Sequence, residues 1–200
     1  MATVAEAVAA IRAGQLVVLP TDTVYGLAAS AHAAGPAGLL AQAKGRDRQQ
    51  PIALLAADLE LLLECVPELE GRAAAIAGVL LPGPYTLVLA NPARRYPWLT
   101  GSRPETIGVR IPAASGPGRE VLEQLGSLAA TSANPTGGPD PRTLAAVSEE
   151  IRAAAEVLLD GGELPGTPST VLDFSGEEPR ILREGAASGA EALRAVASVL

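Results

Sequence analysis

The sequence predicts a layered α/β domain with one principal β-sheet flanked by helices. Short apolar, often β-branched runs that suit buried strands alternate with segments that carry helical spacing and helix-capping residues. The chain of 200 residues shows no internal repeat and no linker long enough to divide it, so residues 1–200 are expected to form a single domain. Only five residues are aromatic, and alanine, leucine and valine must therefore fill the core.

The first half of the chain predicts four helices and three strands. Thr3 and Glu6 have the spacing of a capping box and begin a helix that ends at Gly14. The apolar run Leu16–Leu19, closed by Pro20, predicts the first strand. The elements that follow are a helix opened by Pro36 that ends near Lys44, a strand Ile52–Ala56, a helix capped by Asp58 that runs through Leu63, a helix Glu68–Leu80 and a strand Thr86–Ala90.

The second half begins with a long loop. Four prolines or glycines interrupt residues 91–105 and exclude a regular element there. The elements expected after it are a strand Thr106–Ile111, a helix around Glu120–Leu125, a strand Leu128–Thr131 that enters a glycine- and proline-rich turn, a helix Pro141–Val157, three short strands Val157–Leu159, Thr170–Phe174 and Arg180–Arg183, and a final helix capped by Ser188 and Glu191.

Composition excludes several classes of site. A net charge of −7 argues against broad adhesion to nucleic acid or anionic membrane, although it allows a local basic cleft. A single cysteine, Cys65, excludes an internal disulfide and a multi-thiolate metal site, and we expect it in the core. A single histidine, His32, excludes a histidine-rich zinc site, and we expect it at the surface. The longest apolar run, Ala73–Leu81, is too short to span a bilayer, and no secretory leader is visible; a cytoplasmic protein is expected.

One basic position stands apart from the rest. Lys44 is the only lysine among fifteen basic residues, although the composition favours arginine everywhere else. A compact ammonium group differs from the planar guanidinium fork of arginine, and it suits a position beside phosphate. The alternative is that the single lysine occurs at this position by chance.

Small polar residues gather where predicted strands end. Hydroxyls, amides, backbone N–H groups and paired cations are what a phosphate or carboxylate site requires. Each fragment alone also fits a turn, a helix cap or a strand entry. The segments are Pro20–Gly26, Lys44–Arg46, Thr131–Pro135 and Pro168–Thr170, together with the strand arginines Arg110 and Arg183, neither of which suits a strand buried on both faces unless it meets an anion.

Read in order, seven blocks resemble the YrdC-type L-threonylcarbamoyladenylate synthases. The resemblance extends from about residue 5 to residue 190, and the ordered set is far more specific than any one block. It implies one twisted, mixed sheet with an open phosphate-binding cavity. The blocks are Leu19–Leu27, Lys44–Ile52, Leu81–Leu87, Thr106–Pro112, Thr131–Gly137, Ser169–Asp173 and Ile181–Gly185.

The resemblance also implies an activity. Family members join L-threonine, bicarbonate or CO₂, and ATP to give threonylcarbamoyl-AMP and pyrophosphate, the first step of threonylcarbamoyladenosine formation in tRNA. A tRNA threonylcarbamoyl transferase would take the product, and Mg²⁺ would be held mainly by the ATP phosphates. The implied site residues are a catalytic tetrad of Lys44, Arg46, Ser132 and Asn134, with Thr106 and Arg183 also binding ATP, and Thr23, Arg110 and Ser169 binding threonine.

The sequence departs from the family pattern at a few positions. Leu55 replaces a histidine that contacts threonine in some members, and Gln50 replaces an asparagine. Asp140 stands where a serine is frequent, and we expect it to cap the helix opening at Pro141. Asp22 is a small change from glutamate. Longer members carry a second domain, which we do not expect in 200 residues.

Two other interpretations stay open from the sequence. The first is an RNA- or nucleotide-binding module without turnover, which the charge of −7 and the lack of a basic stripe disfavour. The second is a related enzyme, such as the carbamoyl-transfer module of hydrogenase maturation proteins, which occurs in longer, cysteine-rich chains. Tyr25 and Tyr85 are expected either to line the cavity or to pack. Stable direct tRNA binding is not expected, and oligomeric state and strictness for threonine over serine stay open.

Overall fold

The computed structural model describes residues 2–45, 47 and 49–199, and its strands form one nine-stranded mixed sheet flanked by helices. This architecture confirms the predicted fold class. The elements are α1 (Val4–Arg12), β1 (Val17–Pro20), β2 (Tyr25–Ala29), α2 (Ala34–Ala43), β3 (Ala53–Ala56), α3 (Leu59–Cys65), α4 (Arg72–Leu80), β4 (Tyr85–Ala90), β5 (Thr106–Arg110), α5 (Pro117–Leu125), β6 (Ser127–Ser132), a 3₁₀ turn (Leu144–Ala146), α6 (Glu149–Ala154), β7 (Val157–Leu158), β8 (Thr170–Asp173), β9 (Arg180–Arg183) and α7 (Gly189–Ala197).

The strand order is β7-β1-β2-β6-β3-β5-β4-β8-β9. Three neighbouring pairs are parallel (β1 with β7, β3 with β5, β4 with β8), and the others are antiparallel. The parallel pairing of β3 with β5 sets Leu55 opposite Arg110. Registered partners share a face of the sheet, so the register decides which side chains meet in a site.

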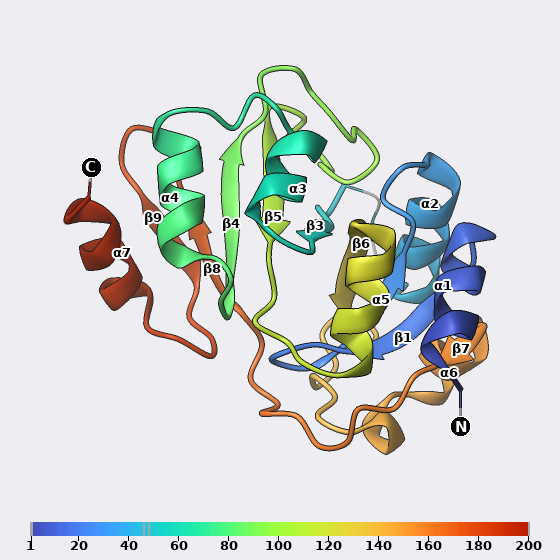
Figure 1. Ribbon diagram of the computed structural model, residues 1–200. Coiled ribbons are helices and arrows are strands. Elements are labelled where there is room, and N and C mark those ends of the chain that lie inside the picture. The colour runs from blue at the N-terminus through green and yellow to red at the C-terminus, as the bar shows by residue number, and fades with distance from the viewer. Residues whose placement is uncertain (1, 46, 48, 200) are drawn as a thin grey trace.

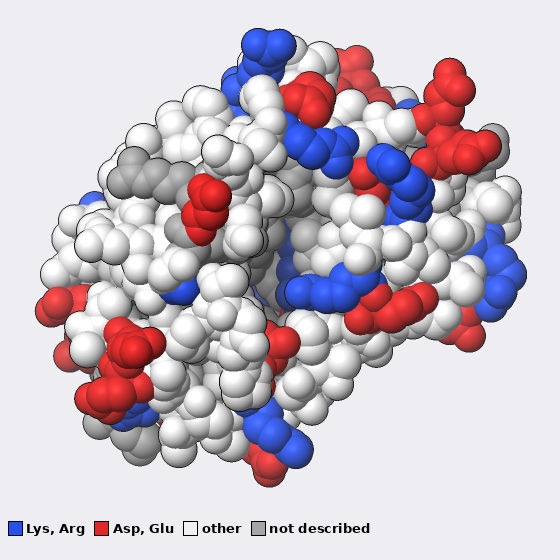
Figure 2. Space-filling view, turned by 180° about the vertical axis from the view of Figure 1, so that it is seen from behind, with Lys and Arg blue, Asp and Glu red and all other residues white. Residues whose placement is uncertain are grey.

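Two apolar clusters hold the helices to the sheet. The smaller cluster joins α1 and α5 to the strands through residues such as Ile11, Val121 and Leu128. The larger one packs α2, α4, α6 and α7 through residues such as Leu40 and Ile76. Figure 1 shows α3, α4 and α5 in front of the sheet, and Figure 2, seen from behind, shows a hollow near the centre of the opposite side. No helix among the described residues is long and apolar enough to cross a membrane.

The helix N-caps predicted from the sequence are confirmed for α1, α3 and α7. In each of them the capping side chain and the backbone N–H that it accepts lie within one helix turn. The Thr3 hydroxyl accepts the backbone N–H of Glu6, whose carboxylate accepts the N–H of Thr3, so the capping box is complete. Asp58 and Ser188 cap α3 and α7 in the same way. These bonds lie within a few residues, which is why the sequence alone predicts them.

Two predictions of secondary structure were wrong. The loop Pro20–Gly26 was expected to follow the first strand and no second strand was predicted there, yet Tyr25–Ala29 forms β2, because it pairs with both β1 and β6 and is buried throughout. The helix predicted over Pro141–Val157 is a 3₁₀ turn followed by the short α6, because Val147 is extended and buried in the core between them. Asp140 therefore has no helix at Pro141 to cap.

Candidate active site

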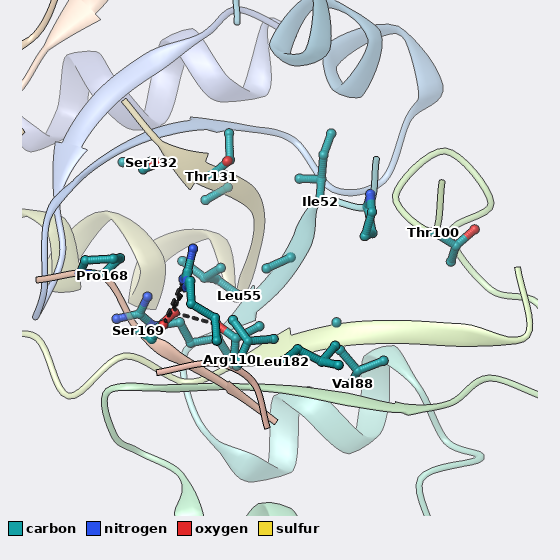
Figure 3. A pocket seen from close by; sticks show the side chains of 18 of the residues that line it. Ile52, Leu55, Val88, Thr100, Arg110, Thr131, Ser132, Pro168, Ser169 and Leu182 are labelled. Carbon is teal, nitrogen blue, oxygen red and sulfur yellow. Dashed lines mark hydrogen bonds between the residues drawn. The ribbon is translucent and has the colours of Figure 1, made fainter. Parts of the chain in front are cut away.

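A cavity of about 340 Å³ lies against the sheet, where β3, β4, β5, β6 and β8 meet. Figure 3 shows Thr131, Ser132 and Ile52 along one wall, with Arg110, Ser169 and Leu182 facing them from the other. The lining is mixed, with hydroxyl groups and arginines around an apolar middle. Such a cavity has the size and composition of a small-molecule site.

The charge of the cavity is opposite to that of the whole chain. Arg103, Arg110 and Arg183 line it, and no acidic side chain is among its described lining residues. Figure 2 shows basic side chains at the edge of the hollow and inside it. The cavity therefore favours an anionic ligand, although the net charge of the chain is −7.

Lys44 lies at the end of α2, is 5% exposed and contacts the residues that follow β6. Its Nζ donates to the carbonyl of Ser132, lies 3.5 Å from Ser132 Oγ and donates to Asn134 Oδ1 at 3.3 Å. Asn134 is held in turn, because its Nδ2 donates to the Gly138 carbonyl at 2.6 Å. A buried ammonium group is thus fixed beside the Ser132 hydroxyl, which lines the cavity.

Arg110, at the end of β5, is a second buried charge of the site, 8% exposed. Its Nη2 pairs with Asp22 and donates to Thr23 Oγ1 at 2.9 Å. Burial lowers the pKa of the Arg110 guanidinium, the Asp22 carboxylate opposes that shift, and nearby Arg183 adds to it. Arg110 Nε is buried and has no hydrogen-bond partner among the described residues. An unpaired buried donor beside a cavity is a position where a ligand oxygen would be stabilised.

Arg183 reaches the same end of the cavity from the edge strand β9. Its Nε and Nη2 donate to the Ser169 carbonyl at 3.1 and 2.8 Å, and the Ser169 hydroxyl lies 2.8 Å from that of Thr86. Strand β9 is exposed along its whole length, so Arg183 does not lie in a strand buried on both faces. Because β9 is an edge strand, the long side chain of Arg183 has space to extend toward the cavity.

The structure brings together all of the predicted site residues that it describes. Thr106, Arg110, Ser132, Ser169 and Arg183 line the cavity. Three further residues lie directly behind that lining, since Lys44 and Asn134 contact Ser132 and each other, and Thr23 contacts Arg110. Arg46 lies outside the described residues.

Asp22, Thr86 and Arg103 were not predicted as site residues, although all three lie at the site. Asp22 pairs with Arg110, Thr86 contacts Ser169, and Arg103 lines the cavity from the loop that precedes β5. The acidic residue between the two threonines of Thr21–Thr23 was a possible signal for Asp22, because a buried arginine needs a counter-charge. No local pattern singles out Arg103.

The remaining sequence hypotheses have clear outcomes. Leu55 lines the cavity and presents only carbon there. Tyr25 packs instead of lining the cavity, is fully buried and makes hydrogen bonds through its hydroxyl group to the segment after β7. His32 is exposed, as expected, and lies 3.0 Å from the Ser127 hydroxyl. Cys65 packs against the larger cluster, as expected.

Comparison with known proteins assigns the chain and its fold to a family. A model described as Sua5_yciO_yrdC, telomere recombination, matches residues 9–185. The chain belongs to the Sua5/YciO/YrdC family. A threonylcarbamoyl-AMP synthase of Pyrococcus abyssi is 36% identical over 176 residues, which cover 88% of this chain and 52% of that protein. A candidate threonylcarbamoyl-AMP synthase of Mycobacterium tuberculosis is 34% identical, over 92% of this chain and 85% of that protein.

A solved structure supports the same relationship. The crystal structure of P. abyssi Sua5 complexed with L-threonine matches with a TM-score of 0.87 and 34% identity, over 96% of this chain and 56% of that one. The chain thus spans little more than half the length of the P. abyssi protein. The family assignment agrees with the resemblance found in the sequence.

Proposed function

We propose that this chain is an L-threonylcarbamoyladenylate synthase. It would convert L-threonine, bicarbonate or CO₂, and ATP to threonylcarbamoyl-AMP and pyrophosphate. The observation that carries the proposal is one cavity with two anion-binding groups, namely buried Arg110 beside Ser169, and Lys44 beside Ser132 and Asn134. The first group suits an amino-acid carboxylate, and the second suits phosphate.

The chemistry fits a site without a dedicated general base. The neutral amine of threonine first adds to CO₂ and releases a proton to water, which gives a carbamate anion. A carbamate oxygen then attacks the α-phosphorus of ATP, and the bond from that phosphorus to the leaving pyrophosphate breaks. The catalytic requirement is to align two anions that repel each other and to stabilise the charge that develops on phosphorus.

Each described residue has a role in this mechanism. Arg110 would hold the threonine carboxylate, with its unpartnered Nε as an additional donor. Lys44 would offset phosphate charge, while Ser132 and Asn134 fix the α-phosphate through their own hydrogen-bond network. Arg183 would close over the triphosphate from the exposed edge strand. Thr23 would orient Arg110 toward threonine.

Magnesium, partners and location are part of the same proposal. Mg²⁺ would be bound mainly by phosphate oxygens and water, because the described residues contain no group of three or more acidic, histidine or cysteine side chains suited to hold a metal. The product would pass to a tRNA threonylcarbamoyl transferase, which completes the tRNA modification. We propose a cytoplasmic location, where ATP, threonine and tRNA are present together.

The deciding experiment incubates the purified chain with L-threonine, bicarbonate, Mg²⁺, α-labelled ATP and pyrophosphatase. We expect a labelled carbamoyl-adenylate whose formation depends on both threonine and bicarbonate. The substitution Lys44→Ala should lower the rate of carbamoyl-adenylate formation by about 100-fold, because the cation proposed to lie beside the α-phosphate is lost. The matched control, Arg72→Ala, removes an exposed cation of α4 outside the cavity lining and should retain full activity. Plain AMP or bound, unreacted ATP from the unaltered chain would reject the synthase and favour a nucleotide-binding module.

A further inference from the structure

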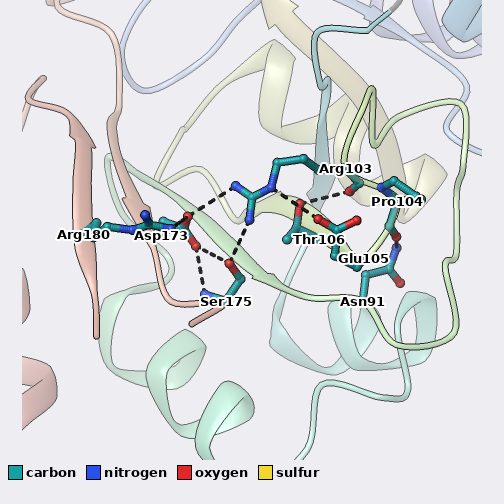
Figure 4. A network of polar contacts seen from close by, with 8 residues as sticks. All are labelled: Asn91, Arg103, Pro104, Glu105, Thr106, Asp173, Ser175 and Arg180. Atoms are coloured by element: carbon teal, nitrogen blue, oxygen red, sulfur yellow. Dashed lines mark hydrogen bonds and ion pairs between the residues drawn. The ribbon is translucent and has the colours of Figure 1, made fainter. Parts of the chain in front are cut away.

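The buried carboxylate of Asp173 lies beside the cavity, and the mechanism above does not use it. Asp173 is 1% exposed and is registered opposite Val88, on the face of the sheet that forms the cavity. Its Oδ1 accepts the N–H and hydroxyl groups of Ser175 at 2.9 and 2.5 Å, and its Oδ2 lies 3.5 Å from Arg103 and 3.2 Å from Arg180 (Figure 4). Burial raises the pKa of Asp173, but the Ser175 hydrogen bonds and the Arg103 charge lower it overall.

Arg103 is the member of this network that reaches the cavity. Its side chain is 46% exposed and also contacts Glu105 at 3.4 Å and Ser175 at 3.3 Å. Two carboxylates therefore contact Arg103, and Arg180 shares one of them, that of Asp173. The three contacts use one N–H group on each guanidinium nitrogen, so two of the five N–H groups have no partner in the described part of the chain.

The loop that carries Arg103 is fastened at several points. Trp98 Nε1 donates to the Ala31 carbonyl at 2.8 Å, and the Ser102 N–H donates to the Gln49 carbonyl at 2.9 Å. Gly101 has a φ of +61°, and a Cβ there would lie 2.1 Å from the same Gln49 oxygen, so this approach requires glycine. Arg103 is therefore held in place by contacts on both sides of its loop.

The part of the cavity next to this loop is lined by uncharged side chains, both hydroxyl-bearing and apolar, apart from Arg103 itself. Thr100 and Val88 lie at one end in Figure 3, and Ser132 and Ser169, with the groups proposed to bind phosphate and carboxylate, lie at the other. Ile52 and Val88 provide apolar surface between them. A ligand with an anionic end and a neutral aromatic end would match this division.

We propose that Arg103 contacts the purine base of ATP, and that Asp173 is the positioning residue that orients its guanidinium. The inference rests on the proposed function, because it assigns the neutral end of that substrate. Lys44 and Arg183 supply cations at the other end of the cavity. By contrast, Arg103 contacts two carboxylates and lies at the end next to Thr100. Its planar face and remaining N–H donors suit a heteroaromatic ring with acceptor nitrogens.

The test measures steady-state constants for the unaltered chain, Arg103→Ala, Arg103→Lys, Asp173→Asn and a control, Arg95→Ala. Arg95 is exposed, lies in the same loop and pairs with half-buried Glu68, outside the cavity lining. Arg103→Ala should raise the KM for ATP about tenfold, the usual size of a base-stacking contact, and leave the KM for threonine and the Ki of pyrophosphate within about twofold. The Arg103→Lys variant should show about the same rise in the KM for ATP as Arg103→Ala, because lysine keeps the positive charge but lacks the planar guanidinium group. Asp173→Asn should also raise the KM for ATP and leave the KM for threonine and the Ki of pyrophosphate unchanged. Arg95→Ala should change none of these constants.

Other outcomes overturn the inference. An equal rise in the KM for ATP and the Ki of pyrophosphate after Arg103→Ala would assign Arg103 to phosphate, and full rescue by Arg103→Lys would agree with that. Unchanged constants for Arg103→Ala would exclude a contact with ATP. If Asp173→Asn lowered only the unfolding temperature, its role would be structural. Failure of the unaltered chain to form the adenylate would reject the proposed function, whatever the variants do.

Discussion

The paired charges of Arg110 and Asp22 serve both the stability of the protein and its proposed chemistry. Both side chains are about nine-tenths buried, and the Asp22 carboxylate also accepts the Ala113 N–H at 3.0 Å. A buried guanidinium is costly unless it is paired, so Asp22 makes it possible to keep Arg110 beside the cavity. The pair leaves Arg110 Nε available to a ligand carboxylate.

Asp22→Asn is expected to lower the free energy of unfolding by roughly 3 kcal/mol, because it leaves the buried Arg110 charge uncompensated. Urea denaturation at pH 7 would measure the change. Glu123→Gln is the matched control, since Glu123 pairs with Arg119 on the exposed surface of α5 and should contribute at most about 0.5 kcal/mol. Equal, small effects of the two substitutions would mean that water in the cavity already screens Arg110.

The hydroxyl group of Tyr25 predicts a dependence of stability on alkaline pH. It lies 2.8 Å from Asp160 Oδ1 and from the Gly162 carbonyl, and it accepts the Gly161 N–H at 2.9 Å. Burial, together with the hydrogen bond to Asp160, raises its pKa to about 12, while the Gly161 N–H opposes the shift. Because the unfolded chain would ionise near pH 10, this contribution is complete below about pH 10 and is lost as pH rises toward about 12.

Tyr25→Phe should lower the free energy of unfolding by about 1 kcal/mol at pH 8, because the hydrogen bonds of the Tyr25 hydroxyl to the exposed residues Asp160 and Gly162 are lost. The difference from the unaltered chain should narrow as the pH rises above about 10. Urea denaturation across this pH range compares the two proteins, in which the other tyrosines contribute equally. A difference in the free energy of unfolding between the two proteins that stays constant with pH would contradict the raised pKa of Tyr25.

The contact of α5 with the end of β1 positions the turn that presents Asp22. Gly118, in the first turn of α5, lies so close that a Cβ there would be 1.9 Å from the Pro20 carbonyl oxygen. Pro20 is also touched by the segment after β7, where a Cβ on Gly161 would be 2.5 Å from the proline ring. Two glycines thus let a helix and a loop close around one strand end, directly before the Thr21–Thr23 turn.

Gly118→Ala should lower the free energy of unfolding by about 3 kcal/mol, since the added methyl meets backbone rather than a mobile side chain. It should also raise the KM for threonine, because the turn that holds Arg110 must shift. Gly35→Ala in α2 is the control, because nothing lies within 4 Å of its added Cβ, and helix propensity should favour it by about 0.5 kcal/mol. If the two variants unfold at the same urea concentration, α5 can move without cost.

Charge is divided across the molecule between the surface and the cavity. The chain carries a net charge of −7, while the cavity is lined by arginines, with Lys44 behind Ser132. Small anions that enter the cavity meet cations, whereas a polyanion that approaches the outer surface meets mostly negative charge. The division favours ATP over an extended RNA backbone.

We therefore expect tRNA to bind with a Kd weaker than about 10 µM at about 0.15 M salt, in the range of non-specific contact. Fluorescence anisotropy with labelled tRNA would measure it, and ATP binding by the same protein sample provides the control for folding. Submicromolar affinity with a steep loss on added salt would contradict the expectation and revive the RNA-binding interpretation.

Much of the fold could be predicted from the sequence where the decisive contacts are local. The capping box of Thr3 and Glu6 spans three residues, and the caps of Asp58 and Ser188 are equally short. Short apolar runs identified most strands, because a buried strand needs little else. Where the prediction failed, at β2 and after Pro141, partners far away in the chain decided the conformation, through pairing with β1 and β6 and through burial of Val147.

The sequence by itself determined the family and the residue types of the site, because both are carried by motifs of a few adjacent residues. Only the tertiary structure decided which of these residues meet. Lys44 reaches Asn134 across 90 positions, and Arg110 reaches Thr23 across 87. It also brought Arg103 together with Asp173, 70 positions away. Asp173 ends one of the seven sequence blocks, whereas no local pattern marks Arg103. Strand order and register set these distances, and they follow from packing of the whole sheet rather than from any one segment.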